Sequence, residues 1–142
     1  MMEILFFDND RTPNLKNKRK LRLYLEKVFL KEKKHIASVS YIFCSDNYLI
    51  RINKDFLKHN YYTDVISFNL AESKGKIQGE IYISVDRIRE NAAKERVPYR
   101  EELHRVIFHG TLHLCGYEDK KREEILKMRK KENMYLKKYF EQ

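Results

Sequence analysis

The stretch that decides the fold reads REELHRVIFHGTLHLCGYED and spans residues 100–119. Pro98 precedes it and Gly116 lies near its end, and these two residue types commonly bound a helix. Phe108 and Leu112 add apolar side chains outside the main apolar stripe. That stripe has helical spacing and consists of Leu103, Val106, Ile107, Gly110 and Leu114. The pattern therefore predicts a central, largely buried helix over residues 100–115.

Two histidines on this helix form a candidate metal site. His109 and His113 are four residues apart, so they lie one turn apart on the same helical face. Gly116 can adopt the left-handed conformation that ends a helix, which lets Asp119 turn back toward the same point. Two imidazoles and one carboxylate leave a coordination position open, as a catalytic metal requires. We therefore predict that His109, His113 and Asp119 bind one metal ion.

The rest of the chain predicts strands and helices on both sides of this stretch. Alternating or β-branched runs indicate strands at residues 4–7, 38–43, 65–70 and 81–85, the last two paired as a hairpin through the turn signal at Ser73–Lys76. Helical spacing indicates helices at residues 15–33, 85–96 and 120–140. A further helix is predicted after Ser45 or Asp46, either of which can cap it, and in this helix Leu49, Ile52 and Phe56 share a face. The prediction is an α+β fold, one domain over residues 1–142, with a small mixed sheet packed against several helices and the metal site on the central helix.

Composition indicates which partner and which cell compartment suit this domain. The net charge is +9, which favours a polyanionic partner such as nucleic acid, although a merely solvated basic surface remains the alternative. Only Cys44 and Cys115 are present, so we expect reduced thiols and a cytoplasmic protein, with Cys115 buried and not a ligand. No apolar run approaches the roughly 20 residues of a membrane span, and none suits a signal peptide.

The histidine spacing is similar to that of the metzincin peptidases, His-Glu-x-x-His-x-x-Gly-x-x-His or Asp. In those enzymes the glutamate after the first histidine is the general base. Gly110 occupies that position in this chain. A zinc peptidase is therefore the weaker alternative.

Three motifs together resemble the YbeY endoribonuclease family. The first is His109-Gly-x-Leu-His-Leu-x-Gly-Tyr117, followed at the family's spacing by Glu124, Met128 and Glu132. The second is Thr63-Asp-Val-Ile-Ser-Phe68, and the third is Gly79-Glu-Ile-Tyr-Ile-Ser84. Their order and spacing also match, from about Ile52 to Glu132.

The resemblance implies a zinc-containing RNase that matures the 3′ end of 16S ribosomal RNA and acts in ribosome quality control. It implies one zinc ion on His109, His113 and Asp119, with His109 also in the catalytic site, and no small-molecule cofactor. The sequence departs from the family at Asp119, where the third ligand is usually histidine. It also departs at Leu57, where many members have an arginine; Lys58 or His59 could supply that cation.

We therefore expect a metal-dependent endoribonuclease that cleaves single-stranded ribosomal RNA in the context of the small ribosomal subunit. A cleft beside His109 should be lined by positive charge, with residues 63–68 along one wall. The alternative from another class is a ribosome-assembly factor that binds RNA with weak or no cleavage, and Leu57 is its support in the sequence.

Overall fold

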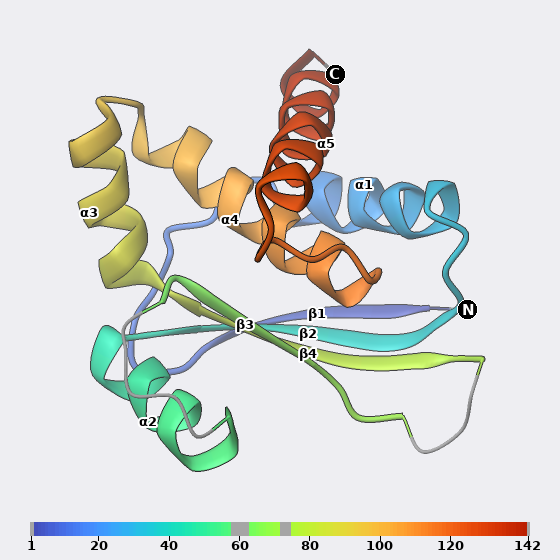
Figure 1. The fold of residues 1–142 in the computed structure, drawn as a ribbon, viewed down its shortest axis with the longest axis horizontal. Helices are drawn as coiled ribbons and strands as arrows, with labels where there is room; N and C mark the ends of the chain where they lie inside the picture. The colour runs from blue at the N-terminus through green and yellow to red at the C-terminus, as the bar shows by residue number, and fades with distance from the viewer. Residues whose placement is uncertain (1, 58–62, 72–74, 142) are drawn as a thin grey trace.

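The computed structural model describes residues 2–57, 63–71 and 75–141 (Figure 1). The elements in chain order are β1 (Glu3–Asp8), α1 (Lys18–Lys31), β2 (Ile36–Cys44), α2 (Asp46–Leu57), β3 (Val65–Asn69), β4 (Ile77–Ser84), α3 (Val85–Glu95), α4 (Tyr99–Leu114) and α5 (Arg122–Glu141). The predicted α+β class is confirmed, and each predicted strand and helix has a counterpart.

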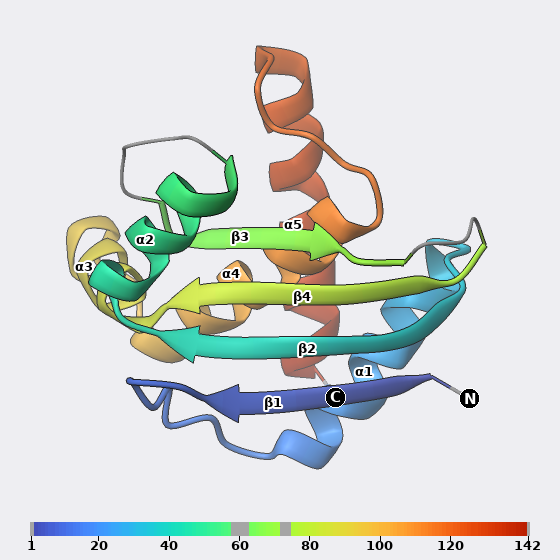
Figure 2. The ribbon, with the colours of Figure 1, turned by 90° about the horizontal axis from the view of Figure 1, so that it is seen from below.

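The strands form one mixed sheet in the order β1-β2-β4-β3 (Figure 2). β1, β2 and β4 are parallel, whereas β3 pairs antiparallel with β4, with Ser67 opposite Ile81. The predicted hairpin is therefore confirmed. Two residues of its predicted turn, Ser73 and Lys74, lie outside the described residues.

One face of the sheet carries α1, α3, α4 and α5, whereas α2 lies on the opposite face near one end (Figure 1). The side chains of the predicted α4 stripe and those of Phe108 and Leu112 are all buried. They pack against the inward side chains of the sheet, among them Val39, Tyr41 and Ile81. α4 is thus the central helix that the sequence predicts.

Gly110 sets how closely α4 approaches the sheet. A Cβ atom at this position would lie 2.6 Å from Ile81 Cγ2 and 2.9 Å from Val65 Cγ2. The Ser67 hydroxyl also donates a hydrogen bond of 2.9 Å to the Gly110 carbonyl. No larger side chain fits here, so a peptidase-type glutamate at Gly110 is excluded by packing as well as by sequence.

We expect Gly110→Ala to destabilise the fold, although alanine is the better helix former by about 1 kcal/mol. Ile81 and Val65 are β-branched and held in strands, so they cannot yield without a backbone shift, and overpacking of this kind costs about 1–3 kcal/mol. Urea unfolding would measure the change. A variant as stable as the parent would contradict the close approach of α4 to β3 and β4.

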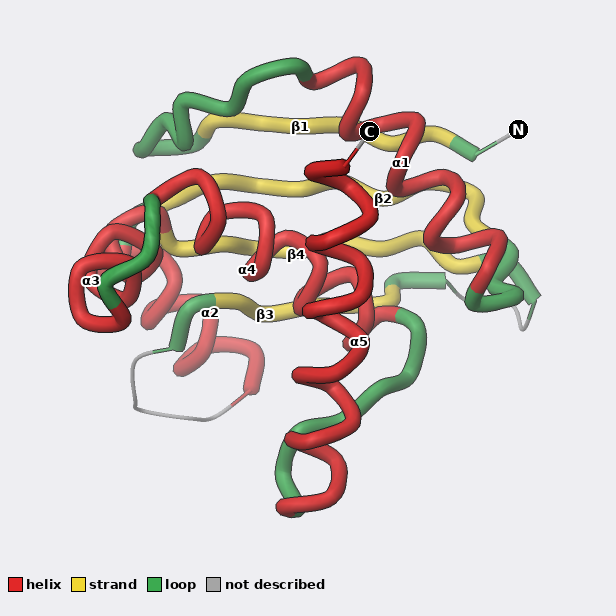
Figure 3. Tube along the Cα trace, turned by 90° about the horizontal axis from the view of Figure 1, so that it is seen from above, coloured by secondary structure: helices red, strands yellow, loops and turns green. Residues whose placement is uncertain are grey.

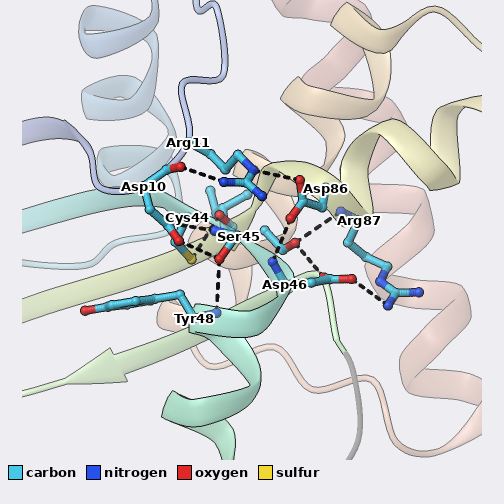
Figure 4. A network of polar contacts seen from close by, with 10 residues as sticks. Asp10, Arg11, Cys44, Ser45, Asp46, Tyr48, Asp86 and Arg87 are labelled. Carbon is cyan, nitrogen blue, oxygen red and sulfur yellow. Dashed lines mark hydrogen bonds and ion pairs between the residues drawn. The ribbon is translucent and has the colours of Figure 1, made fainter.

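A polar network ties together the carboxyl ends of β1, β2 and β4 (Figure 4). Ser45 caps α2, since its hydroxyl accepts a hydrogen bond of 3.1 Å from the Tyr48 amide. Asp10 in turn accepts bonds from the Ser45 amide and hydroxyl, at 2.7 and 2.6 Å. Ser84 caps α3 and donates to Asp46 at 2.7 Å, and the network continues through Arg11, Asp86 and Arg87. These contacts fix where α2 and α3 leave the sheet.

The predicted start of α1 is wrong, whereas the predicted face of α2 agrees with the structure. α1 begins at Lys18 and not at residue 15, because Asn14 and Asn17 adopt positive φ angles of 55° and 56° that a helix cannot contain. On α2, Leu49 and Ile52 pack into one small apolar cluster that also includes Phe68 of β3. Phe56 is 67% exposed but contacts Phe68 edge-on, with the ring centroids 6.2 Å apart, so it lies on the face that the sequence predicts.

His104 is a buried histidine that takes no part in the candidate metal site. Its Nδ1 lies 2.7 Å from the Arg100 carbonyl, so Nδ1 carries the proton, and its ring stacks on Tyr139 with centroids 5.1 Å apart. Among the described residues, nothing hydrogen-bonds to its buried Nε2. Burial lowers the pKa of His104 from 6.5 to about 4.

This pKa predicts a loss of stability in acid. Between pH 6.5 and about 4 the unfolded chain takes up a proton at His104 and the folded chain does not, so the free energy of unfolding falls with pH by up to about 3 kcal/mol. Urea unfolding at pH 7.5 and pH 4.5 would measure this. His104→Phe should narrow the difference between the two pH values, and an unchanged difference would exclude His104 as its source.

Candidate metal centre

The end of α4 is built to return the chain toward its own last turn. Gly116 has a φ of 103°, its amide donates to the His113 carbonyl at 3.0 Å, and the Tyr117 amide donates to the Leu112 carbonyl at 3.0 Å. These two bonds make a Schellman motif. The turn directs residues 117–121 back along the helix, and so Asp119 reaches His109 and His113 as the sequence predicts.

The three side chains converge on one point. His109 Nε2 and His113 Nε2 are 3.0 Å apart, and Asp119 Oδ2 lies 3.1 Å from the first and 3.3 Å from the second. Each of the three side chains is partly buried, with Asp119 the most exposed at 38%. In the described part of the chain, this is the group of three that could hold a metal ion.

The hydrogen-bond partners of Nδ1 in His109 and His113 show that Nε2 of each ring is free to bind a metal ion. His109 Nδ1 faces the Glu132 carboxylate at 2.5 Å, and His113 Nδ1 faces the Tyr117 carbonyl at 2.9 Å. Both partners are acceptors, so both Nδ1 atoms carry the proton in the neutral rings. Two Nε2 lone pairs and a carboxylate then face one another, and only a cation or an added proton relieves their repulsion. This donor set fits zinc.

Glu132 connects His109 to the protein interior. The carboxylate is 4% exposed and accepts a bond of 3.0 Å from Arg105 Nη1 in addition to the bond from His109. Burial alone would raise the pKa of Glu132, but the bonds from His109 and Arg105 outweigh it and lower the pKa. A carboxylate behind a ligating histidine fixes its ring and makes it a better electron donor.

A cavity of about 550 Å³ opens beside His109, between α4 and α5. Its charged lining is mixed: Arg105 and Arg129 face it, but so do Asp64, Glu102, Asp119 and Glu132. The prediction of a cleft lined by positive charge is therefore wrong. Of these carboxylates, Glu132 accepts bonds from His109 and Arg105, and Asp119 faces the two histidines. Of the expected wall at residues 63–68, Asp64 contributes.

Sequence reasoning gave Glu132 and Arg105 no role. Arg105 precedes His109 by one helical turn, so spacing could have placed them on the same face. Glu132 is 23 residues away on α5, and only the packing of α5 against α4 reveals their contact. Cys115 is a buried free thiol, as predicted. Leu57 ends α2 and is 39% exposed, whereas Lys58 and His59 lie outside the described residues.

Fold and site together define the class of protein: a metal-dependent hydrolase with a His-His-carboxylate group at the end of the central helix of an α+β fold. The family profile described as Endoribonuclease YbeY matches residues 3–140. The chain belongs to the YbeY endoribonuclease family.

Relatives and a solved structure agree with this membership. The chain is 47% identical to Endoribonuclease YbeY of Cytophaga hutchinsonii over 133 residues, which cover 94% of this chain and 93% of the relative. It is 49% identical to that of Flavobacterium psychrophilum over 114 residues, which cover 80% and 81%. The solution structure of TM1509 from Thermotoga maritima matches with a TM-score of 0.60 and 30% identity, covering 99% of this chain and 89% of that one.

Proposed function

We propose that this protein is a zinc-dependent endoribonuclease that cleaves single-stranded RNA, with ribosomal RNA of the small subunit as its substrate. His109, His113 and Asp119 would bind the metal. The observation that carries the proposal is the convergence of three bare ligand atoms within 3.3 Å of one another, in a chain that belongs to this family.

The protein's own residues have distinct tasks in this proposal. A divalent cation bound there would supply a Lewis acid for the phosphate and a means to acidify water. Glu132 keeps the proton of His109 on Nδ1, so that Nε2 remains a ligand. Arg105 holds Glu132 in place, and Arg129, whose side chain is 56% exposed, is available to stabilise phosphate charge at the cavity.

The setting in the cell follows from simpler observations. Among the described helices, none is both long and apolar enough to cross a membrane. Cys44 and Cys115 are both buried free thiols, which suits a reducing compartment. We propose that the reaction takes place in the cytoplasm; the choice of small-subunit ribosomal RNA as the substrate rests on the family to which the chain belongs.

A circular single-stranded RNA tests the proposal, because only an endonuclease can open a circle. We expect the zinc-loaded protein to linearise it, a chelator to stop cleavage, and added zinc to restore it. A duplex of the same sequence should be cleaved far more slowly. If the zinc-loaded protein binds the circle and never opens it, the chain is an RNA-binding assembly factor and the proposed activity is wrong.

RNA binding should depend strongly on salt. Lys127 and Lys131 lie with their ammonium groups 5.5 and 5.7 Å from the centre of the Tyr117 ring, beside the turn that carries Asp119. Each phosphate that a lysine neutralises releases counterions, so contact with about five phosphates should lower the affinity for single-stranded RNA roughly 100-fold between 50 and 200 mM salt. Fluorescence anisotropy would measure it. An affinity independent of salt would argue against contact with the RNA backbone.

A further inference from the structure

The cavity between α4 and α5 contains a buried carboxylate that the metal centre does not use. Glu102 is 8% exposed and lines this cavity. Its charged neighbours include Arg105 and Arg129, but no described residue donates a hydrogen bond to its carboxylate. Burial raises the pKa of Glu102, because the charged carboxylate is less well solvated at this position. Such a group has capacity for a ligand that brings its own donors.

The opposite wall of the cavity is apolar and partly open to solvent. Ile125 is 49% exposed and Leu126 is 62% exposed, although α5 is otherwise rich in charge. With Val106 and Met128 they line the same space as Glu102. This end of α5 projects past the edge of the sheet at β3 (Figure 3). An apolar surface next to polar groups that can read a base edge, Glu102 among them, suits an unstacked base.

We propose that this cavity is a nucleobase-binding subsite next to the metal centre, in which the Glu102 carboxylate selects guanine. The proposal rests on the proposed function, since it names the base beside the phosphate that is cleaved. A volume of about 550 Å³ lies in the range of ligand pockets and admits one nucleotide. Ile125, Leu126 and Met128 would cover the base, while Glu102 would read its edge.

The choice of guanine follows from donor geometry. Its Watson–Crick edge presents N1–H and the N2 amino group side by side, and these match the two oxygens of one carboxylate. Cytosine and adenine each offer one amino group next to a ring nitrogen that is an acceptor. Uracil offers one N–H between two carbonyl groups, and a carboxylate repels the oxygens of both carbonyls. The expected order of affinity is guanine first, cytosine and adenine next, and uracil last.

Binding of the four 5′-monophosphates to the zinc-loaded protein tests this order, because their phosphate and ribose are shared. We expect the guanine nucleotide to bind at least about tenfold more tightly than the uracil nucleotide, with saturable shifts of the Met128 methyl resonance. Glu102→Gln presents an amide in place of the second acceptor and should remove most of that tenfold difference. Equal affinities in the parent, or a preference that survives in Glu102→Gln, would overturn the proposal.

Two control variants distinguish base selection by Glu102 from general contact with the apolar wall. Glu101→Gln makes the same charge change one residue away, at a side chain that lines a different cavity, and should keep the guanine preference. Leu126→Ser removes an exposed part of the apolar wall and should weaken all four nucleotides by a similar factor. Loss of preference in Glu101→Gln would show that net charge, and not Glu102, sets the order.

Cleavage of uracil-rich RNAs that contain a single guanine distinguishes this inference from the proposed function. If the parent protein cleaves only near the guanine and Glu102→Gln cleaves at many positions, both the subsite and the nuclease activity are supported. Selective nucleotide binding without cleavage of any RNA supports the subsite and contradicts the nuclease. Cleavage at every position, unchanged in Glu102→Gln, supports the nuclease and overturns the subsite.

Discussion

His109→Ala should abolish both metal binding and RNA cleavage. The substitution removes one of the three proposed ligands and also the group that connects the site to Glu132. Loss of an outer partner alone costs 10–100-fold in metal affinity, so loss of the ligand itself should cost more than about 100-fold. Cleavage should fall roughly 1000-fold or more, since a metal ion contributes several kcal/mol to stabilising the transition state.

The control for this variant is His35→Ala, which makes the same change at an exposed histidine that does not line the cavity beside His109. It should retain the parent's zinc content and rate. Competition with a chelating dye would give the metal affinity, and gel electrophoresis of labelled RNA the rate. If His109→Ala still binds one zinc with the parent's affinity, His109 is not a ligand.

Glu132→Ala is expected to give the next largest loss. It removes the acceptor that keeps the proton on His109 Nδ1 and leaves Arg105, which is 17% exposed, without its ion pair. Metal affinity should fall 10–100-fold. Glu132→Gln can still accept from His109 through its amide oxygen, so it should recover part of the affinity.

This partial rescue distinguishes a positioning role from a purely structural one. Glu132→Ala should also lower the free energy of unfolding, because the partly buried Arg105 loses its partner. Glu132→Gln should bind zinc more tightly than Glu132→Ala, even if these two variants unfold at the same urea concentration. Equal zinc affinity in the parent, Glu132→Gln and Glu132→Ala would mean that Glu132 does not support His109.

Local patterns predicted much of the fold. The apolar stripe of α4, the alternation in β2 and the turn signal after β3 are all short-range features, and the mixed sheet followed from them. Helix ends were less well predicted, because the positive φ angles of Asn14 and Asn17 are set by the path of the loop and not by helical spacing.

The candidate site divides in the same way. His109, His113, Gly116 and Asp119 lie within one helix end, so spacing alone placed them together. Glu132 and Glu102 depend on how α5 packs against α4, and no periodicity in either helix encodes that contact. The sign of the cleft's charge was predicted wrongly because net charge describes the whole surface, whereas this cavity gathers four carboxylates beside two arginines.

Titration of metal-free protein with zinc, with RNA cleavage followed in the same samples, tests the central claim most directly. The claim is that His109, His113 and Asp119 hold one ion on which cleavage depends. We predict that cleavage rises in proportion to added zinc and reaches its plateau at one equivalent per chain. Two results would contradict the account. The first is cleavage at the full rate by the metal-free protein, and the second is a cleavage rate that has not reached its plateau when one equivalent of zinc is bound.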